Sequence, residues 1–180
     1  MKIGVLALQG SFAEHGEVLD LLEVEYRWVR SLQDLKNLTH LIIPGGESGT
    51  MEKLLKEFNM WEEIVNAKNL KIFGTCAGAI LCEKFGANIV IDRNAYGAQQ
   101  ESFTTDLTSP RFKNLKGVFI RAPRIEPLTS NSSPRERGEP KVLAYHKDEP
   151  VLVEDRNFLL ATFHPEILAE TRIHEYFLGR

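Results

Sequence analysis

The residues of this chain best suited to covalent chemistry are Cys76, His164 and Glu166. Cys76 follows an apolar run at residues 70–73, which is typical of a buried strand, and precedes a run at residues 79–85 that predicts a helix. Glycines on both sides permit a sharp turn, and a thiol at a helix N-terminus has its thiolate favoured by the helix dipole. Because a free cysteine is often only a small core residue, Cys76 alone fits a nucleophile and a structural turn equally well.

The segment Phe163-His164-Pro165-Glu166 supplies a base and a carboxylate directly after the apolar run at residues 158–161. Cysteine, histidine and a carboxylate can form a nucleophilic triad in which the carboxylate orients the imidazole. An isolated His-Pro-Glu is more often a surface turn. Here, however, the cysteine and the histidine both follow predicted strands, and sites in open α/β sheets form at strand ends. The two segments together therefore favour the triad.

A third turn, Pro44-Gly45-Gly46-Glu47-Ser48, follows the apolar run at residues 41–43. Apolar residues recur at helical spacing over residues 51–58, so the turn is predicted to open a helix. Backbone N–H groups at such a turn can bind a phosphate or the oxyanion of an acyl-transfer intermediate. A Walker-type phosphate loop needs Gly-Lys-Ser/Thr, whereas this chain has a glutamate, which repels phosphate, in place of the lysine. The turn is therefore predicted to contribute to an oxyanion hole.

The order of the apolar runs predicts an α/β fold with three layers: a mostly parallel sheet, helices on both faces, and antiparallel strands at one edge. At 180 residues and 43% hydrophobic, the chain fits a single domain over residues 1–180. In the first half, strands are expected at residues 3–8, 26–29, 41–43 and 70–73, and helices at 13–22, 51–58 and 79–85. In the second half, strands are expected at 89–91, 103–107, 117–121, 142–145, 151–153 and 159–163, a surface loop at 127–140 and a helix at 170–178.

The motifs around Gly46, Cys76 and His164, in this order and spacing, resemble those of class I (triad-type) glutamine amidotransferases. Further segments resemble the family of glutaminase subunits of pyridoxal phosphate synthase: Ile-Gly-Val-Leu-Ala-Leu-Gln-Gly at 3–10, Asp-Arg-Asn-Ala-Tyr-Gly at 92–97, Ser-Phe at 102–103 and Val-Phe-Ile-Arg-Ala-Pro at 118–123. The resemblance covers nearly the whole chain. It departs from the family at Ala98, where an arginine is usual, and in a short segment between the helix after Cys76 and Arg93.

The resemblance implies hydrolysis of L-glutamine to L-glutamate and ammonia through a cysteinyl thioester. The ammonia would pass to a partner lyase subunit that synthesises pyridoxal phosphate, a form of vitamin B6. Cys76 would be the nucleophile, His164 the base and then the acid, and Glu166 the residue that orients the imidazole. The resemblance assigns the oxyanion hole to the N–H groups of Gly46 and Ala77, and the substrate contacts to Gly46, Glu47, Ser48, Arg93, Ile120 and Arg121. It implies no cofactor and no metal.

The remaining features argue against several classes of partner and site. With 22 basic and 25 acidic residues the net charge is -3, and no cationic run favours nucleic acid or anionic lipid. No apolar run is long enough to span a bilayer, and the run at residues 3–8 is too short for a signal peptide, so a cytoplasmic location is expected. Cys82 is expected in the core, unpaired with Cys76. His15 is expected on a helix surface. The histidines outside the triad are scattered singly along the sequence, which argues against a zinc site; they are His15, His40, His146 and His174.

Two other functions would use the same residues. One is the glutaminase subunit of another amidotransferase, and the other is a stand-alone cysteine hydrolase or peptidase of related fold. A peptidase would have no need for Arg93 and the segment at residues 118–123 around a pocket the size of an amino acid. A catalytically silent assembly subunit is disfavoured because the triad is intact.

Overall fold

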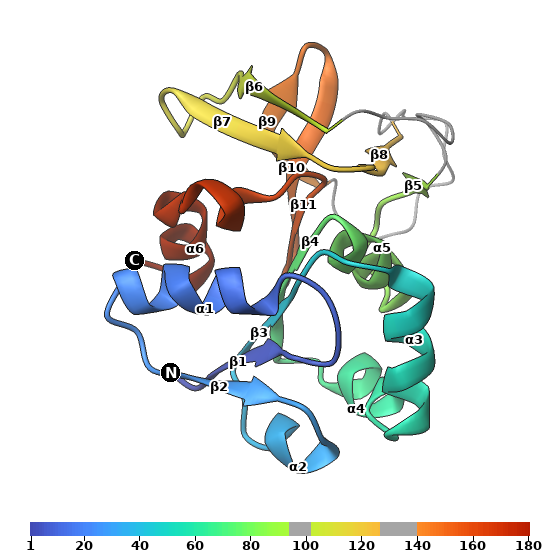
Figure 1. Cartoon of the computed structure of the whole chain (residues 1–180). Coiled ribbons are helices and arrows are strands. Elements are labelled where there is room, and N and C mark those ends of the chain that lie inside the picture. The colour runs from blue at the N-terminus through green and yellow to red at the C-terminus, as the bar shows by residue number, and fades with distance from the viewer. Residues whose placement is uncertain (94–101, 127–139) are drawn as a thin grey trace.

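The structure is a computed structural model, and it describes residues 1–93, 102–126 and 140–180. Its centre is a seven-stranded sheet of strand order β2-β1-β3-β4-β11-β10-β9 (Figure 1). The first five of these strands run parallel, and β10 and β9 continue the sheet as antiparallel strands at one edge. The strands in chain order are β1 (Ile3–Leu6), β2 (Tyr26–Val29), β3 (His40–Ile43), β4 (Lys71–Thr75), β9 (Lys141–His146), β10 (Glu149–Asp155) and β11 (Phe158–Ala161).

Helices cover both faces of this sheet because the inner strands are apolar on both sides. In β3, Leu41 and Ile43 belong to one buried cluster, whereas Ile42 between them belongs to the other. The first cluster is covered by α2 (Leu32–Leu35), α3 (Ser48–Glu57), α4 (Trp61–Asn66) and α5 (Ala77–Lys84), and the second by α1 (Phe12–Leu21) and α6 (Thr171–Leu178) (Figure 1). The predicted fold class, three layers with a mostly parallel sheet, is confirmed.

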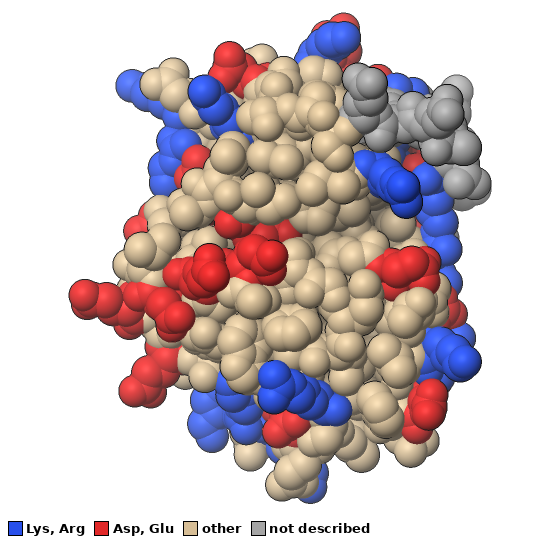
Figure 2. Space-filling view, viewed as in Figure 1, with Lys and Arg blue, Asp and Glu red and all other residues tan. Residues whose placement is uncertain are grey.

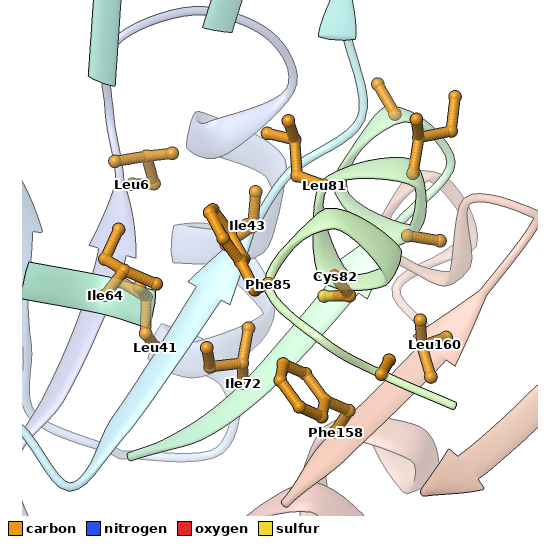
Figure 3. Close-up of a cluster of buried hydrophobic side chains, with 14 of the residues drawn as sticks. Leu6, Leu41, Ile43, Ile64, Ile72, Leu81, Cys82, Phe85, Phe158 and Leu160 are labelled. Carbon is orange, nitrogen blue, oxygen red and sulfur yellow. The ribbon is translucent and has the colours of Figure 1, made fainter. Parts of the chain in front are cut away.

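The first cluster attaches α5 to the sheet. Figure 3 shows Leu81, Cys82 and Phe85 from this part of the chain in one cluster with strand residues that include Ile43 and Ile72. Cys82 is fully buried, as the sequence predicted, and it is a free thiol. Because Cys76 immediately precedes α5, the packing of this helix determines where the Cys76 thiol lies.

The strands of the second half differ from the prediction. Only β9, β10 and β11 join the main sheet, whereas β5 (Ile91–Asp92) pairs with β8 (Arg124–Ile125), and β6 (Phe103–Leu107) pairs with β7 (Leu115–Phe119), as separate antiparallel pairs. The β6–β7 pair and the hairpin of β9 and β10 lie together at the top of Figure 1. The chain after β7 thereby reaches the end of β4.

The surface of the molecule carries an acidic region but no continuous basic patch on the face that Figure 2 shows. Acidic side chains gather over α1 in Figure 2, where Glu14, Glu17 and Asp20 lie, and the Lys and Arg side chains visible on this face form no continuous patch. Of the helices that the structure describes, none has the length and apolar character needed to cross a membrane.

One tight contact holds α5 against the end of β3. A Cβ atom added to Gly78, in the first turn of α5, would lie 2.1 Å from the backbone oxygen of Ile43. Since this neighbour is backbone, it cannot move aside as a flexible side chain would. Only glycine therefore allows α5 to begin this close to β3.

We predict that Gly78→Ala destabilises the fold by about 1–3 kcal/mol, the range measured for overpacked interiors. The measurement is the urea midpoint of unfolding. The control is Gly49→Ala in the first turn of α3, where the nearest atoms to an added Cβ are side-chain oxygens of Glu47 at 3.4 Å. This control should be neutral or slightly stabilising, because alanine in a helix is favoured over glycine. Equal midpoints for Gly78→Ala and the unchanged chain would contradict the prediction.

Candidate active site

Cys76 lies at a sharp turn between β4 and α5. Its backbone has φ 48° and ψ −106°, a left-handed conformation that is strained for a residue with a side chain. The backbone N–H of Cys76 donates to the carbonyl of Ala161 at the end of β11, at 2.8 Å. This geometry matches the nucleophile elbow that the sequence suggested, in which a strained turn presents a side chain at the top of the sheet.

His164 and Glu166 follow β11, and their side chains form a buried pair. Nδ1 of His164 lies 2.7 Å from Oε1 of Glu166, and both side chains are almost inaccessible to solvent. The backbone N–H of His164 donates to the carbonyl of Val118 in β7 at 2.8 Å, which fixes the start of the segment. Glu166 lies in a short 3₁₀ helix, η1 (Pro165–Leu168), which the sequence did not predict.

The electrostatics of the pair favour a charged imidazole. Burial by itself lowers the pKa of His164, but hydrogen bonds to the side chains of Cys76 and Glu166 outweigh it and raise the pKa to about 10. Burial by itself raises the pKa of Glu166, but the imidazoles of His15 and His164 outweigh it and lower the pKa to about 2. A proton of the Cys76 thiol can therefore pass to His164, and the ionised carboxylate stabilises the imidazolium that results.

The segment after β7 lies next to the thiol. Sγ of Cys76 is 3.7 Å from the carbonyl oxygen of Ile120, and Ile120 itself is partly exposed. Arg121, the next residue, has φ 45° and is exposed to solvent. The structure thus brings Ile120 to the thiol as expected and places Arg121 beside it in the chain.

The glycine turn after β3 packs directly on the imidazole. A Cβ on Gly45 would lie 2.2 Å from Cε1 of His164, so only glycine fits between the turn and the ring. The carbonyl of Gly45 accepts the N–H of Ser11 at 3.0 Å, and the N–H of Glu47 donates to Oε1 of Gln9 at 2.8 Å. The chain that follows β1 therefore holds the turn from both sides of Gly46.

Glu47 has a structural role that the sequence did not indicate. Its carboxylate caps α3 by accepting the backbone N–H groups of Gly49 at 3.1 Å and Thr50 at 2.6 Å. Hydrogen bonds from Thr50 and Gly49, and to a smaller extent the charge of Arg93, lower the pKa of this carboxyl. Arg93 is exposed to solvent, and Ser48, which follows Glu47, is the first residue of α3.

Two expectations fall outside the described residues: the departure at Ala98 and most of the loop predicted at residues 127–140. The position of Ala77 is described, as the first residue of α5 directly after Cys76. Within residues 1–93, 102–126 and 140–180, no three His, Cys, Asp or Glu side chains are grouped so as to hold a metal ion.

The prediction that His15 lies on a helix surface is wrong. His15 is completely buried, with Nδ1 2.9 Å from Nε2 of His174 and Nε2 3.1 Å from the hydroxyl of Thr75. The histidines are therefore not all scattered singly. Nε2 of His15 also lies 3.6 Å from Oε2 of Glu166. Helical spacing could have found this residue, because His15 precedes Val18 and Leu19 by three and four positions on the apolar face of α1.

Comparisons with known proteins agree with this geometry. The sequence profile of the SNO glutamine amidotransferase family matches residues 5–180. The pyridoxal 5'-phosphate synthase subunit PdxT of Thermotoga neapolitana is 44% identical, over 99% of this chain and 98% of its own. The same subunit from Thermosipho africanus is 40% identical, over 99% of this chain and 98% of its own.

Solved structures show the same fold. A crystal structure of a glutamine amidotransferase is 40% identical to this chain, with a TM-score of 0.85 over 98% of this chain and 97% of that chain. PurLQS from Thermotoga maritima shares the fold at 17% identity, with a TM-score of 0.70 over 99% of this chain and 97% of that chain.

The geometry predicts that the two thiols differ sharply in reactivity. Iodoacetamide should alkylate Cys76 in the folded protein much faster than Cys82, because His164 can hold the proton of the Cys76 thiol. Cys82 should react only after unfolding, since burial raises its pKa. Mass spectrometry of the labelled peptides provides the measurement, and His164→Asn should slow the alkylation of Cys76. Faster labelling of Cys82 would show that Cys76 is not activated.

Proposed function

Because the chain belongs to the SNO glutamine amidotransferase family, we propose that it hydrolyses L-glutamine to L-glutamate and ammonia as the glutaminase subunit of pyridoxal 5'-phosphate synthase. The observation that carries the proposal is the alignment of Cys76, His164 and Glu166 at the ends of adjacent parallel strands β4 and β11. The likeness to the synthase subunits over almost their full length supports the choice of this subunit.

In the proposed mechanism, the Cys76 thiolate attacks the carbon of the glutamine side-chain amide. The C=O bond opens to a tetrahedral oxyanion, and the thiol proton resides on His164. As the oxyanion collapses, the C–N bond breaks, and His164 gives its proton to the departing nitrogen, which leaves as ammonia. His164 then takes a proton from water, the hydroxide attacks the thioester, and the C–S bond breaks to release glutamate. Glu166 stays ionised throughout and stabilises the imidazolium.

The oxyanion hole is assigned to the backbone N–H groups of Gly46 and Ala77. Ala77 is the first residue of α5, where N–H groups have no partner inside the helix. Gly46 lies in the turn that packs on His164, and the contacts of Gly45 with Ser11 and of Glu47 with Gln9 support its peptide planes. One such donor contributes roughly 10²- to 10³-fold in rate.

The substrate contacts are assigned by the chemistry of an amino acid. An amino acid brings an α-carboxylate, which needs cationic or N–H partners, and an α-ammonium, which needs acceptors. Arg93 and Arg121 are exposed cations, Arg121 directly follows Ile120, and the Ile120 carbonyl is an acceptor 3.7 Å from Sγ of Cys76. The remaining contacts are assigned to Gly46, Glu47 and Ser48 at the start of α3.

The proposed partner is the synthase (lyase) subunit, which uses the ammonia. The residues expected at this contact are Gln9 and Gly10, which leave β1 and touch the glycine turn. A partner that binds here would act on Gly46 through contacts that already exist. The proposal places the reaction in the cytoplasm, where two free thiols stay reduced.

The alternative functions make different demands on the same site. A peptidase would need a groove for an extended chain, whereas the exposed cations Arg93 and Arg121 suit the carboxylate of a single free amino acid better. A glutaminase subunit of another amidotransferase shares the hydrolysis but would not be stimulated by the pyridoxal phosphate synthase subunit. Measuring which substrate is hydrolysed, glutamine or a peptide, and whether the synthase subunit stimulates the reaction therefore distinguishes the three functions.

We predict that Cys76→Ala abolishes ammonia release from glutamine in the presence of the synthase subunit, whereas Cys82→Ala retains most of it. The assay measures ammonia with the chain alone, with the partner added, and with peptides in place of glutamine. The chain alone should be a weak glutaminase that the partner stimulates. Full activity in Cys76→Ala, or hydrolysis of peptides but not glutamine, would contradict the proposal.

A second prediction concerns recognition of the amino acid. Arg93→Ala and Arg121→Ala should each raise the KM for glutamine more than they lower kcat, because an exposed cation that holds the substrate carboxylate contributes mainly to binding. Lys113→Ala, which removes an exposed cation elsewhere on the surface, is the matched control. Unchanged kinetics in both arginine variants would place the substrate carboxylate elsewhere.

A further inference from the structure

Behind Glu166 lies a buried pair of histidines that the proposed mechanism does not use. His15 in α1 and His174 in α6 are both completely buried, and they contact each other through Nδ1 of His15 and Nε2 of His174 at 2.9 Å. On the far side, Nδ1 of His174 lies 3.4 Å from the carbonyl of Glu170. On the near side, Nε2 of His15 faces Thr75 at 3.1 Å and Glu166 at 3.6 Å.

The two oxygens of Glu166 are unequally satisfied. Oε1 accepts the hydroxyl of Ser11 at 2.8 Å and lies 2.7 Å from Nδ1 of His164. Oε2 is buried and has no hydrogen-bond partner among the described residues, and Nε2 of His15 lies 3.6 Å away. An unpaired oxygen on a buried carboxylate is costly, so the cost depends on whether Nε2 of His15 carries a proton.

Two tautomers of the neutral pair are self-consistent. If both rings carry the proton on Nδ1, His174 donates to Glu170 and His15 donates to His174, and a lone pair of His15 then faces Oε2 of Glu166. If both carry it on Nε2, His174 donates to His15, and the N–H of His15 points toward Thr75 and the carboxylate. The carboxylate discriminates between them because it repels a lone pair and attracts an N–H.

A hydrogen bond from Nδ1 of His174 to the carbonyl of Glu170 would be weak, so it does little to hold the proton on Nδ1. Its length of 3.4 Å exceeds the usual range for such bonds, about 2.7–3.2 Å. Glu170 is also the N-cap of α6, and the carbonyl of an N-cap residue already accepts the first hydrogen bond of its helix. Losing this contact therefore leaves no orphaned carbonyl, whereas the other tautomer leaves Oε2 facing a lone pair.

From this geometry, and on the basis of the proposed function, we propose that His15 is a positioning residue of the triad. Held by His174 in the tautomer protonated on Nε2, it donates toward Oε2 of Glu166 and keeps the carboxylate ionised and oriented toward His164. Ser11 and His164 then contact Oε1 of Glu166, while the N–H of His15, which lies 3.1 Å from the Thr75 hydroxyl, attracts Oε2 electrostatically from 3.6 Å.

The other charged groups near the pair leave this assignment intact. On its own helix, His15 is influenced by the carboxylate of Glu14, and from the segment after β11 by Glu166 and His164. His174 is influenced by His15 and Glu166. Burial is the largest influence on both rings and lowers the pKa of each, that of His174 to about 3, so both are neutral at physiological pH.

His15→Leu should lower kcat for glutamine hydrolysis in the complex with the synthase subunit about tenfold while KM changes less than about twofold. Without the N–H, the carboxylate stabilises the imidazolium of His164 less well. The thiolate then forms only at higher pH, and His164 loses its proton at lower pH. The acid limb of the pH profile should therefore move up and the alkaline limb down, each by about one unit.

Two further variants separate positioning from packing. His15→Gln, which can bring an amide N–H toward the place of Nε2, should recover part of the pH range. His40→Leu removes another buried histidine, which packs on Phe177 of α6 and lies at the opposite end of β3 from the glycine turn, and it should alter stability but leave the pH profile unchanged. A wild-type pH profile in His15→Leu, or an equal narrowing in His40→Leu, would overturn the proposal.

The tautomer can be measured without turnover. Long-range ¹⁵N–¹H spectra of the full chain carrying Cys76→Ala should show His15 and His174 both protonated on Nε2, and protonation on Nδ1 in both would overturn the proposal. This experiment tests the role of His15 separately from the proposed glutaminase function. If the unchanged chain released no ammonia from glutamine with its partner, the proposed function would fail, whereas the tautomers would still decide the role of His15.

Discussion

The left-handed backbone conformation of Cys76 is the constraint on which the rest of the site depends. A residue with a side chain held at φ 48° is strained by about 1–3 kcal/mol, so the surrounding structure must hold it there. The hydrogen bond from its N–H to Ala161 ties it to β11, and the contact of Gly78 with Ile43 sets the start of α5. The backbone of Cys76 is therefore fixed relative to β3 and β11.

The sheet topology explains why those neighbours meet. In the parallel part of the sheet, β3, β4 and β11 are adjacent, so their carboxyl ends bring together three turns that are far apart in the chain. They carry Gly46, Cys76 and His164. The β6–β7 pair completes the arrangement from above, because Val118 accepts the N–H of His164 and Ile120 contacts the thiol. The irregular second half of the chain thus serves the same site as the regular first half.

The sequence predicted those parts that follow from local patterns. The parallel strands, their apolar faces and the turn residues were found because buried strands followed by glycines are strong local signals. The start of α3 was placed too late, at residue 51 instead of Ser48, because its cap is a glutamate carboxylate and the prediction relied on apolar spacing. The short α4, at Trp61–Asn66, has too few residues to show a period. The pairing of β5 with β8 and the contact of His15 with His174 join segments that are distant in sequence, which a local pattern does not contain.

The contacts among the buried histidines and Glu166 also make the stability of the fold depend on pH. The pKa of Glu166 falls from 4.5 to about 2 on folding, so its contribution to stability is present above pH 4.5 and is lost as the pH falls toward 2. The pKa of His174 falls from 6.5 to about 3, so its neutral burial penalises the folded state only when the pH falls below 6.5. The pKa of His164 rises from 6.5 to about 10, so its contribution is full below pH 6.5 and is lost as the pH rises toward 10. The same buried polar layer that orients the imidazole thus makes the fold most stable near neutral pH, where the proposed thiolate and imidazolium coexist.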